Sequence, residues 1–395
     1  MDNWKNLHQE EEIRLYAPGG APRIVAIGGG HGLSTMLRGL KRYSRDITAI
    51  VTMADDGGGS GMLRQDLGML PPGDARDCVL ALANTEPVME RLMTYRFQEG
   101  TLEGQNFGNL MMAALNGIYG SFAEAVRQMG QVLAITGRVL PVTEEDIHLQ
   151  AQFEDGSSVF GESAIFYHKK ATRKRIRRVV LTPEHPSAFP ESIEAIARAD
   201  LILIGPGSLY TSIIPNFLVT GITEAVMASP AYKLMVMNLM TQDGETEGYF
   251  ASDHLRELLR HGQSGMVDGC LANDSPIPEH LQEEYIREGA DVMCVDREGV
   301  EALGVKLYTA PLLSSRCEYA RHDPALLAQA IMNVWNQQGR AVCAGKTDRR
   351  EPCRLHQKSG RSCVGSCRKN AAAVLPSATG SCCSAIPLRR MRSRL

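Results

Sequence analysis

The sequence predicts an α/β fold: a Rossmann-like, doubly wound, mostly parallel sheet with helices on both faces, followed by a disordered C-terminal tail. Short apolar segments alternate with amphipathic segments of helical period from residue 23 to residue 337. Several of the apolar segments run directly into glycine-rich loops, an order that is typical of open parallel sheets. We therefore predict a polar leader over residues 1–21 and a single large domain over residues 22–338.

The first half of this domain begins with a strand, a helix and a second strand. The second strand is nearly continuous in apolar side chains, which is the pattern of a parallel strand covered on both faces. Two long helices and a β-rich insertion near residues 132–178 follow. The expected elements are strands at 23–27 and 46–53 and helices at 33–43, 77–98 and 108–129.

The second half repeats the alternation with shorter connections. Proline near a first turn and serine before an amphipathic run are typical of helix starts, and Ser252 is such a predicted N-cap. The expected strands lie at 177–181, 201–204, 233–238, 267–271, 291–295 and 305–308, and the expected helices at 190–199, 252–260, 279–288 and 324–337.

Residues 340–395 differ from the rest of the chain. They hold 13 Lys and Arg against 2 Asp and Glu, a net charge of +11, whereas the preceding residues carry −14. Only eight of these 56 residues are Leu, Ile, Val or Phe, too few to bury a core. We predict a disordered accessory tail. Cys353, His356, Cys363 and Cys367 could supply zinc ligands, but their spacing is irregular for a structural site.

Cysteine usage and hydropathy point to a cytoplasmic protein. Cys78, Cys270, Cys294 and Cys317 are scattered through apolar contexts and are expected to be buried thiols, not a disulfide framework. No run of about 18 apolar residues predicts a transmembrane helix, and residues 1–11 lack the apolar core of a secretory signal.

The loop at residues 28–32, Gly-Gly-Gly-His-Gly, lies between a predicted strand and helix. Glycines let backbone N–H groups approach an anion, and the following helix N-terminus adds partial positive charge. The dinucleotide fingerprint G-x-G-x-x-G fails, because its third glycine would fall on Leu33 or Thr35. Asp55 stands where a ribose-binding acid would follow the second strand, so an NAD-dependent dehydrogenase stays open as an alternative.

Acidic and glycine-rich segments follow other predicted strands. Asp55 and Asp56 precede a second glycine run and could bind a cation, a ribose or a substrate hydroxyl, or simply cap a helix. Asp74 lies in a third loop and could likewise cap the next helix. Gly207 and Ser208 follow a strand of the second half, where backbone amides and hydroxyls could hold a second anionic group.

These loops together resemble the gluconeogenesis-factor family, the YvcK-like proteins, which is related to the CofD-like 2-phospho-L-lactate transferases. The resemblance spans roughly residues 22–337. It rests on PRIVAIGGGHGLS (22–34), DITAIVT (46–52), ADDGG (54–58), PPGD (71–74), GNL (108–110), LTP (181–183), IGPGSLYTS (204–212), MTQ (240–242), GET (244–246) and RHD (321–323).

The resemblance implies a cytosolic factor that binds a UDP-sugar such as UDP-N-acetylglucosamine and supports cell shape and envelope synthesis during gluconeogenic growth. It also implies the alternative, a metal-dependent transferase of a phosphorylated group from a nucleotide donor, with Mg as the possible cofactor at Asp55 and Asp74. Neither reading names a catalytic residue. An envelope-synthesis protein partner and a homo-oligomer are further expectations.

The resemblance also implies which residues bind the nucleotide sugar. Most belong to the glycine-rich and acidic loops, and Tyr285 and Arg321 are expected at the nucleotide, one for stacking or hydrogen bonding and one for gripping the diphosphate. The complete expected set is Gly29, Gly30, Gly32, Leu33, Asp55, Asp56, Asp74, Asn109, Gly207, Ser208, Tyr285 and Arg321.

Two features leave alternatives open. His31 stands where the resembled family usually has threonine; it could donate to a phosphate or be an ordinary replacement. The basic run over residues 169–178 could bind nucleic acid, although aromatic residues are sparse there, or form the solvated face of a hairpin.

Overall fold

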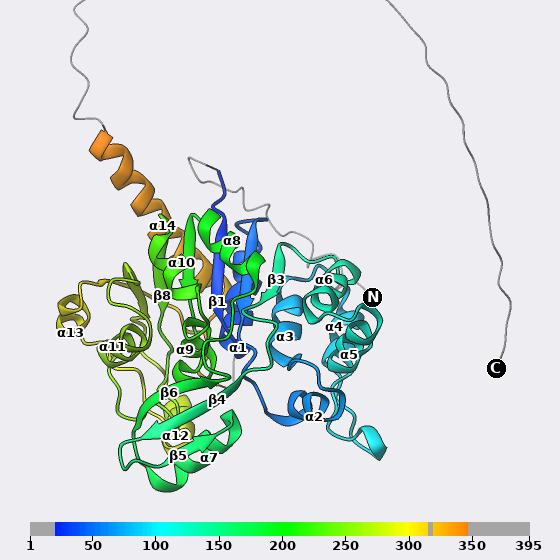
Figure 1. Ribbon diagram of the computed structural model, residues 1–395. Coiled ribbons are helices and arrows are strands. Elements are labelled where there is room, and N and C mark those ends of the chain that lie inside the picture. The colour runs from blue at the N-terminus through cyan, green and yellow to red at the C-terminus, as the bar shows by residue number, and fades with distance from the viewer. Residues whose placement is uncertain (1–19, 315–318, 347–395) are drawn as a thin grey trace, which may run out of the picture. The chain divides into compact units, whose positions relative to one another are not determined.

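The computed structural model describes residues 20–314 and 319–346 (Figure 1). A seven-stranded sheet, parallel throughout, forms the centre of this part of the chain, with strand order β10-β9-β8-β7-β1-β2-β3. The strands are β1 (Ile24–Gly28), β2 (Ile47–Val51), β3 (Arg138–Pro141), β7 (Leu201–Ile204), β8 (Tyr232–Val236), β9 (Gly269–Asn273) and β10 (Lys306–Ala310). The predicted Rossmann-like parallel sheet is confirmed.

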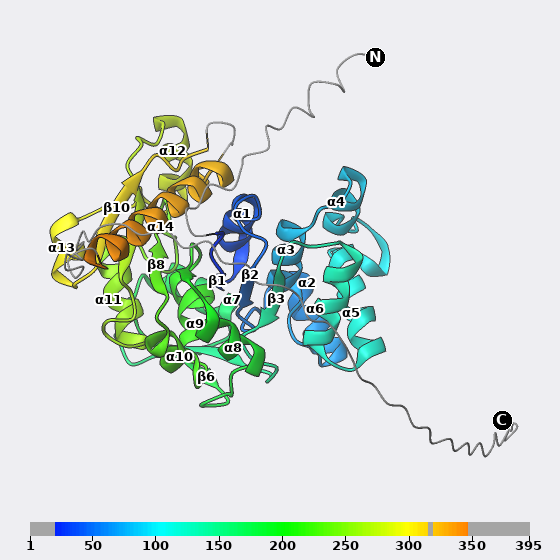
Figure 2. The ribbon, with the colours of Figure 1, turned by 90° about the horizontal axis from the view of Figure 1, so that it is seen from above.

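Helices cover both faces of the sheet, as expected. Figure 2 shows α1 (Gly30–Leu40) and α14 (Pro324–Lys346) on one face, and α8 (Pro190–Arg198), α9 (Ile214–Phe217) and α10 (Ile222–Ala228) on the other. Every residue of β1, β2 and β7 is buried, because both faces of these strands are covered. The other helices are α2 (Gly58–Leu67), α3 (Gly73–Leu82), α4 (Pro87–Thr94), α5 (Phe107–Tyr119), α6 (Phe122–Val132), α11 (Ala251–His261), α12 (Glu279–Glu288) and α13 (Arg297–Ala302).

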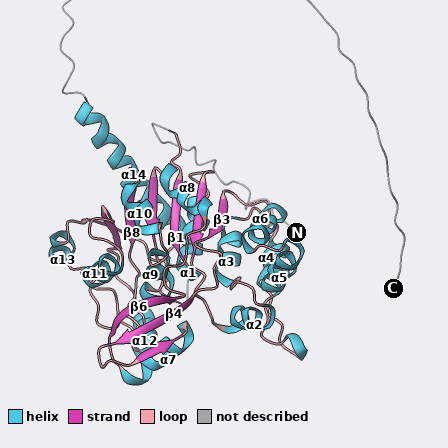
Figure 3. Cartoon of the chain, in the orientation of Figure 1, coloured by secondary structure: helices cyan, strands magenta, loops and turns pink. Residues whose placement is uncertain are grey.

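Part of the β-rich insertion expected near residues 132–178 forms a second, antiparallel sheet, whereas its first strand, β3, belongs to the central sheet (Figure 3). The strands of the antiparallel sheet are β4 (His148–Phe153), β5 (Ser158–Phe160) and β6 (Ile176–Thr182), in the order β5-β4-β6, so the strand expected at 177–181 belongs to this sheet and not to the central one. The insertion also contains a helix, α7 (Glu162–Thr172), that was not expected. The basic run is therefore a helix end, a turn and a strand, and not a hairpin. Lys169 is buried, whereas the other six basic side chains of the run are exposed to solvent, as the solvated-face interpretation predicted.

Two helices that the periodicity predicted as continuous are each broken. The segment at 77–98 contains α3 and α4, which begins with Pro87. The segment at 108–129 breaks at Gly120, whose φ of 71° ends α5 in a left-handed conformation. The Ser121 side chain then accepts a hydrogen bond from the Glu124 N–H and caps α6. Apolar periodicity continued across both breaks because the paired helices pack on one core.

Three further expectations need correction. Residues 291–295 are not a strand and make only isolated bridges, which leaves Cys294 exposed. Ser252 is not an N-cap: its N–H donates to Asp296, and the Asp253 carboxylate receives the Phe250 N–H instead. α14 continues to Lys346, nine residues beyond its expected end at residue 337.

Several expectations concern residues outside the described part of the chain. They are the polar leader up to residue 19, the tail from residue 347 onward, the candidate zinc ligands and Cys317. Within the described residues, no helix is long and apolar enough to cross a bilayer.

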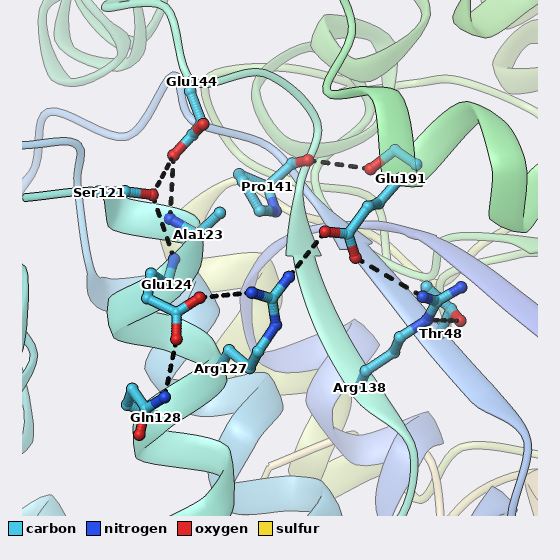
Figure 4. Close-up of polar contacts among 11 residues, drawn as sticks. Thr48, Ser121, Ala123, Glu124, Arg127, Gln128, Arg138, Pro141, Glu144 and Glu191 are labelled. Carbon is cyan, nitrogen blue, oxygen red and sulfur yellow. Dashed lines mark hydrogen bonds and ion pairs between the residues drawn. The ribbon is translucent and has the colours of Figure 1, made fainter. Parts of the chain in front are cut away.

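A polar network fastens helices to the sheet edge formed by β3 (Figure 4). Arg127 of α6 pairs with Glu124 and with Glu191 of α8. Arg138 of β3 donates to the Thr48 hydroxyl of β2 at 3.0 Å and lies 3.7 Å from Glu191. Exposed ion pairs each contribute only about 0–1 kcal/mol, so this network fixes position more than it stabilises. It holds α6 and α8 beside an edge strand that would otherwise stay open.

The packing of α1 against the start of α14 depends on Gly39. A Cβ atom on Gly39 would lie 1.9 Å from the Pro324 carbonyl oxygen and 2.8 Å from the Ala328 Cβ atom. Only glycine allows the two helices to approach this closely, and α1 is the helix that carries the first glycine-rich loop.

We expect Gly39→Ala to lower the free energy of unfolding by about 1–3 kcal/mol, the usual cost of overpacking a closed contact. Gly117→Ala is the matched control, because Gly117 lies in the exposed part of α5 with nothing within 4 Å of its Cβ position. That change should raise stability by up to about 1 kcal/mol through helix propensity. Urea unfolding measures both. Equal stability of the Gly39→Ala protein and the parent would contradict the described α1–α14 packing.

Candidate functional site

Two glycine-rich loops meet at one edge of the central sheet. They follow β1 and β7, which are adjacent strands. On one side of this strand pair β1 is followed by β2 and β3. On the other side β7 is followed by β8, β9 and β10. In open parallel sheets, ligands bind in the crevice beyond the carboxyl ends of the strands where the strand order reverses in this way.

The two loops approach each other backbone to backbone. A Cβ atom on Gly32 would lie 2.5 Å from the Pro206 carbonyl oxygen, and one on Gly207 would lie 3.1 Å from the Gly29 carbonyl oxygen. Side chains at these glycines would separate the loops. Gly30 has a φ of +68°, in the left-handed region, and begins α1. The arrangement leaves amide groups and a helix N-terminus at the sheet edge.

A cavity of about 410 Å³, here called the first chamber, opens between the loops. Six segments of the chain line it: the α1 loop, the end of β2, the starts of α3 and α7, the π-helical turn Leu209–Ile213 with the loop before it, and the segment after β8. The lining residues are Gly29, Gly30, His31, Gly32, Thr52, Asp55, Asp74, Glu162, Gly207, Ser208, Thr211, Ser212, Asn238 and Gln242.

A second chamber of about 300 Å³ continues from the first. His31, Gly32, Asn238 and Gln242 line both, so the two form one elongated cleft. The second chamber adds residues from α12 and from the segment before α14, namely Tyr285, Ala320, Arg321 and His322, together with Thr35, Pro206, Leu239, Met240 and Thr241.

Side-chain amides after β8 hold the second glycine loop in place. The Asn238 Oδ1 atom accepts the Gly207 N–H at 3.0 Å, and its Nδ2 donates to the Gly207 carbonyl at 2.8 Å. The Ser208 hydroxyl donates to the Gln242 Oε1 atom at 2.6 Å. This loop is therefore positioned before any ligand arrives, which lowers the entropic cost of binding.

Three carboxyl groups face the first chamber. Asp74 lies directly against the first loop: a Cβ atom on Gly29 would be 2.4 Å from its Oδ2 atom. Burial and the neighbouring Asp55 raise the pKa of Asp74 to about 7, although a hydrogen bond from the Gly30 N–H opposes the shift. Burial also raises the pKa of Asp55, and burial with Asp55 and Asp74 raises the pKa of Glu162 well above its usual range.

A fourth carboxyl group lies behind this wall. Glu245 is buried and accepts hydrogen bonds from the Thr211 hydroxyl at 3.1 Å and from the Tyr210 N–H at 3.3 Å. Burial raises its pKa to about 7. Because Thr211 also interacts with Glu162, it connects the chamber wall to Glu245. Asp74 and Glu245, each with a pKa of about 7, can therefore hold or release protons near neutral pH in response to a ligand.

The carboxyl groups at the first chamber could bind a divalent cation only together with a ligand that supplies further oxygen atoms. Within the described residues, no three His, Cys, Asp or Glu side chains are grouped closely enough to hold a metal by themselves. Mg²⁺ is usually bound by one or two carboxylates together with substrate phosphates and water. Asp55 and Asp74 fit that role: burial disfavours the charged form of both, Asp55 adds to the effect at Asp74, and a nearby cation would offset it.

The second chamber is less acidic. The Tyr285 hydroxyl donates to the Ala320 carbonyl at 3.4 Å, and the Arg321 guanidinium lies 5.6 Å from the centre of the Tyr319 ring. Burial lowers the pKa of His322 to about 4, so its ring is neutral at pH 7. Asp323 caps α14 by accepting the N–H groups of Ala325 and Leu326, which leaves Arg321 out of the cap.

Most of the residues expected at the site lie together along this cleft. Gly29, Gly30, Gly32, Asp55, Asp74, Gly207 and Ser208 line the first chamber, and Tyr285 and Arg321 line the second.

Three expected residues lie elsewhere. Leu33 is fully buried in the core beneath the first loop. The Asp56 carboxylate accepts the Ser163 N–H and hydroxyl, both at 2.9 Å, and so holds the start of α7. Asn109 is buried in α5 and accepts a hydrogen bond from Arg76 at 2.7 Å. These side chains support the surroundings of the cleft without lining it.

The sequence analysis missed Glu162, Asn238, Gln242 and Thr52. Asn238 is the last residue of the strand predicted at 233–238 and Gln242 follows that strand, so their position at the sheet edge could have been predicted. No sequence signal indicated Glu162. It lies at the start of α7, within the insertion, and reaches the cleft only through the packing of that helix. His31 lines both chambers with a side chain that is 84% exposed, 3.9 Å from Asp77.

Comparison with known proteins shows the family of the chain. The family model described as 2-phospho-L-lactate transferase CofD matches residues 24–313. A protein of Thermoanaerobacterium thermosulfurigenes is 49% identical over 313 residues, covering 79% of this chain and 97% of the relative. The Bacillus subtilis protein named gluconeogenesis factor is 44% identical over 317 residues, covering 80% of this chain and 99% of its own length.

A solved structure extends the comparison to three dimensions. A crystal structure of a Bacillus halodurans protein has a TM-score of 0.76 and 44% sequence identity, covering 79% of this chain and 99% of that chain. A second crystal structure from the same organism, described as a UPF0052 family member, matches with the same values. The chain therefore belongs to the CofD family and, within it, to the proteins named gluconeogenesis factors.

Proposed function

We propose that the protein is a cytoplasmic factor that binds a UDP-sugar, such as UDP-N-acetylglucosamine, in the two-chamber cleft and supports cell shape and envelope metabolism during gluconeogenic growth. The proposal rests on one observation: the two chambers of the cleft offer different chemical groups to a ligand. The first chamber offers loop amides and a helix N-terminus, which suit a diphosphate. The second offers Tyr285 and Arg321, which suit a nucleoside or sugar and a phosphate oxygen.

The relatives' name supports the physiological part of the proposal. The Bacillus subtilis and Halalkalibacterium halodurans proteins are both named gluconeogenesis factor. A binding protein can serve such a role without turnover, since the occupancy of its cleft reports the concentration of an envelope precursor. An envelope-synthesis protein and further copies of the chain are the partners we propose for it.

A second candidate is a transferase that moves a phosphorylated group from a nucleotide donor. The family description and the pairing of Asp55 with Asp74 favour it. Mg²⁺ held there with the donor's phosphates would stabilise developing charge. In that case the chain's own residues bind the donor through the loops, and Asp74 or Glu162 takes or gives a proton at the acceptor.

Calorimetry with UDP-N-acetylglucosamine, GDP and NAD, each with and without Mg²⁺, separates the candidates. Binding of the UDP-sugar without a metal requirement favours the factor. GDP binding that requires Mg²⁺ favours the transferase. Binding of NAD alone would contradict both.

We expect Gly30→Val to weaken UDP-N-acetylglucosamine binding at least tenfold while the protein stays folded. The nearest atom to the new Cβ would be the Ser212 Oγ atom at 3.8 Å, so the fold has room and the side chain occupies the chamber instead. Gly120→Val is the control, because Gly120 has a similar φ of +71° and open space around it. Calorimetry and thermal melting check both variants. Full affinity in a folded Gly30→Val protein would show that the loop is only a turn.

We expect Arg321→Ala to weaken UDP-sugar binding by about 2 kcal/mol, the scale of a lost charge-assisted hydrogen bond, with little change in melting temperature. Asp323→Ala should behave in the opposite way. It removes the α14 cap, which costs about 1 kcal/mol of stability, and leaves affinity unchanged. If Arg321→Ala lowers the melting temperature and not the affinity, Arg321 has a structural role.

We expect UDP-sugar affinity in metal-free buffer to fall as the pH rises from 6 to 8. Asp74, with a pKa of about 7, then becomes charged against the loop that would hold the diphosphate. In Asp74→Asn the affinity should vary less with pH. This variant should also melt at a higher temperature than the parent at pH 8, because a carboxyl with a raised pKa loses its stabilising contribution as pH rises through about 7. A parent affinity that is constant from pH 6 to 8 would count against the role of Asp74.

A further inference from the structure

A separate cavity of about 470 Å³ lies between the end of α7, the turn that follows it, the end of α12 and the loop after β8. Its lining holds five basic side chains and three acidic ones, with Ile286 and Gly289 as the remainder. The basic side chains are Lys169, Lys170, Arg173, Arg175 and Arg287. We call it the basic cavity. None of its lining residues lines the two-chamber cleft.

Two of the three acidic side chains in the basic cavity form ion pairs with the two lysines. Lys169 is buried and pairs with Glu247 at 2.5 Å, and Lys170 pairs with Asp243 at 2.6 Å. Glu288 is the third acid, and it raises the pKa of Lys170 only as a minor neighbour.

The three arginines have no ion-pair partner in the described part of the chain, and together with Glu288 they leave the basic cavity a net charge of +2. Within residues 20–314 and 319–346, the guanidinium groups of Arg173 and Arg175 make no ion pair. Arg287 donates its Nε hydrogen to the Glu283 carbonyl at 3.2 Å, and its other donors have no ion-pair partner in the same residues. Three guanidinium groups that face one hollow form a set of fork-shaped donors, which matches phosphate oxygens.

We propose that the basic cavity is a second ligand site, for a small molecule that carries at least two phosphate groups. The size and concavity of the hollow favour a small ligand over an extended polymer, which would need a charged track and aromatic platforms. The three arginines offer more fork-shaped donors than one phosphate group can accept from, which favours a ligand with two phosphate groups. The site differs in chemistry from the first chamber, which offers backbone amides and carboxyl groups.

One loop, residues 242–247, separates the basic cavity from the cleft and presents different residues to each. Gln242 and Glu245 contact Ser208 and Thr211 on the cleft side. Asp243 and Glu247 face the basic cavity, and Glu247 also accepts the Gly244 N–H at 2.8 Å. An anion that competes for Lys170 would release Asp243 from its pair, so occupancy of the cavity acts on residues 242–247 and, under the proposed function, on the cleft.

The test is a titration of inorganic pyrophosphate into the full-length protein, followed by calorimetry. Arg175→Ala/Arg287→Ala removes two cavity arginines. Arg177→Ala/Arg178→Ala is the matched control, because it removes the same charge from exposed positions of β6 outside the cavity. We expect the cavity variant to lose one pyrophosphate site or to bind it at least tenfold more weakly, and the control to keep it.

Hydrogen exchange of residues 241–247 provides a readout that does not depend on UDP-sugar binding. Pyrophosphate should change exchange at Asp243 and Glu247 in the parent and the control. In the cavity variant only a change at the cleft-side residues Thr241 and Gln242 should remain, because the first chamber can also hold a diphosphate. If the cavity double variant does not fold, Arg287→Gln alone should weaken the site at least threefold. Unchanged binding in a folded cavity variant, or equal loss in both double variants, would overturn the proposal; equal loss would indicate a diffuse basic surface. Failure of UDP-sugar binding would leave these pyrophosphate results unaffected.

Discussion

The close approach of two glycine loops at the centre of the sheet is the constraint on which the rest of the site depends. Gly32 fits against the Pro206 carbonyl, and Gly207 fits against the Gly29 carbonyl, with no room for a Cβ atom at Gly32. The approach is possible because β1 and β7 are neighbours that point the same way. It leaves backbone amides, not side chains, at the reversal point of the sheet, and so defines where an anionic ligand would be held.

The acids near these loops reduce the stability of the fold at neutral pH. Carboxyl groups whose pKa is raised by burial contribute against folding once they ionise, and Asp74, Glu162 and Glu245 are all of this kind. Such groups persist where a ligand or proton offsets their charge. Asp74 and Glu162 line the first chamber, where a ligand can reach them, and Glu245 lies behind the wall and is connected to it through the Thr211 hydroxyl.

The parts of the fold that follow local rules could be predicted from the sequence. β7 lies at the predicted residues and α12 has the predicted bounds, because each is a short segment bounded by clear turn or helix signals. Glycine loops after strands identified both sides of the cleft. Features that depend on long-range packing could not be predicted from the sequence. Asp56 is adjacent to Asp55 in sequence, yet its carboxylate binds the start of α7, because the inserted sheet places that helix beside it. The break at Gly120 was hidden because the apolar period continues across it.

A crystal structure of the protein with UDP-N-acetylglucosamine bound tests the central claim most directly. The account predicts that the diphosphate contacts N–H groups of the first loop, at residues 29–32, and the Ser208 N–H, because the Gly207 N–H is already donated to Asn238. It also predicts that the remainder of the ligand extends into the second chamber toward Tyr285 and Arg321. Ligand density that lies elsewhere, or that fills the second chamber without contact to either glycine loop, would contradict the account.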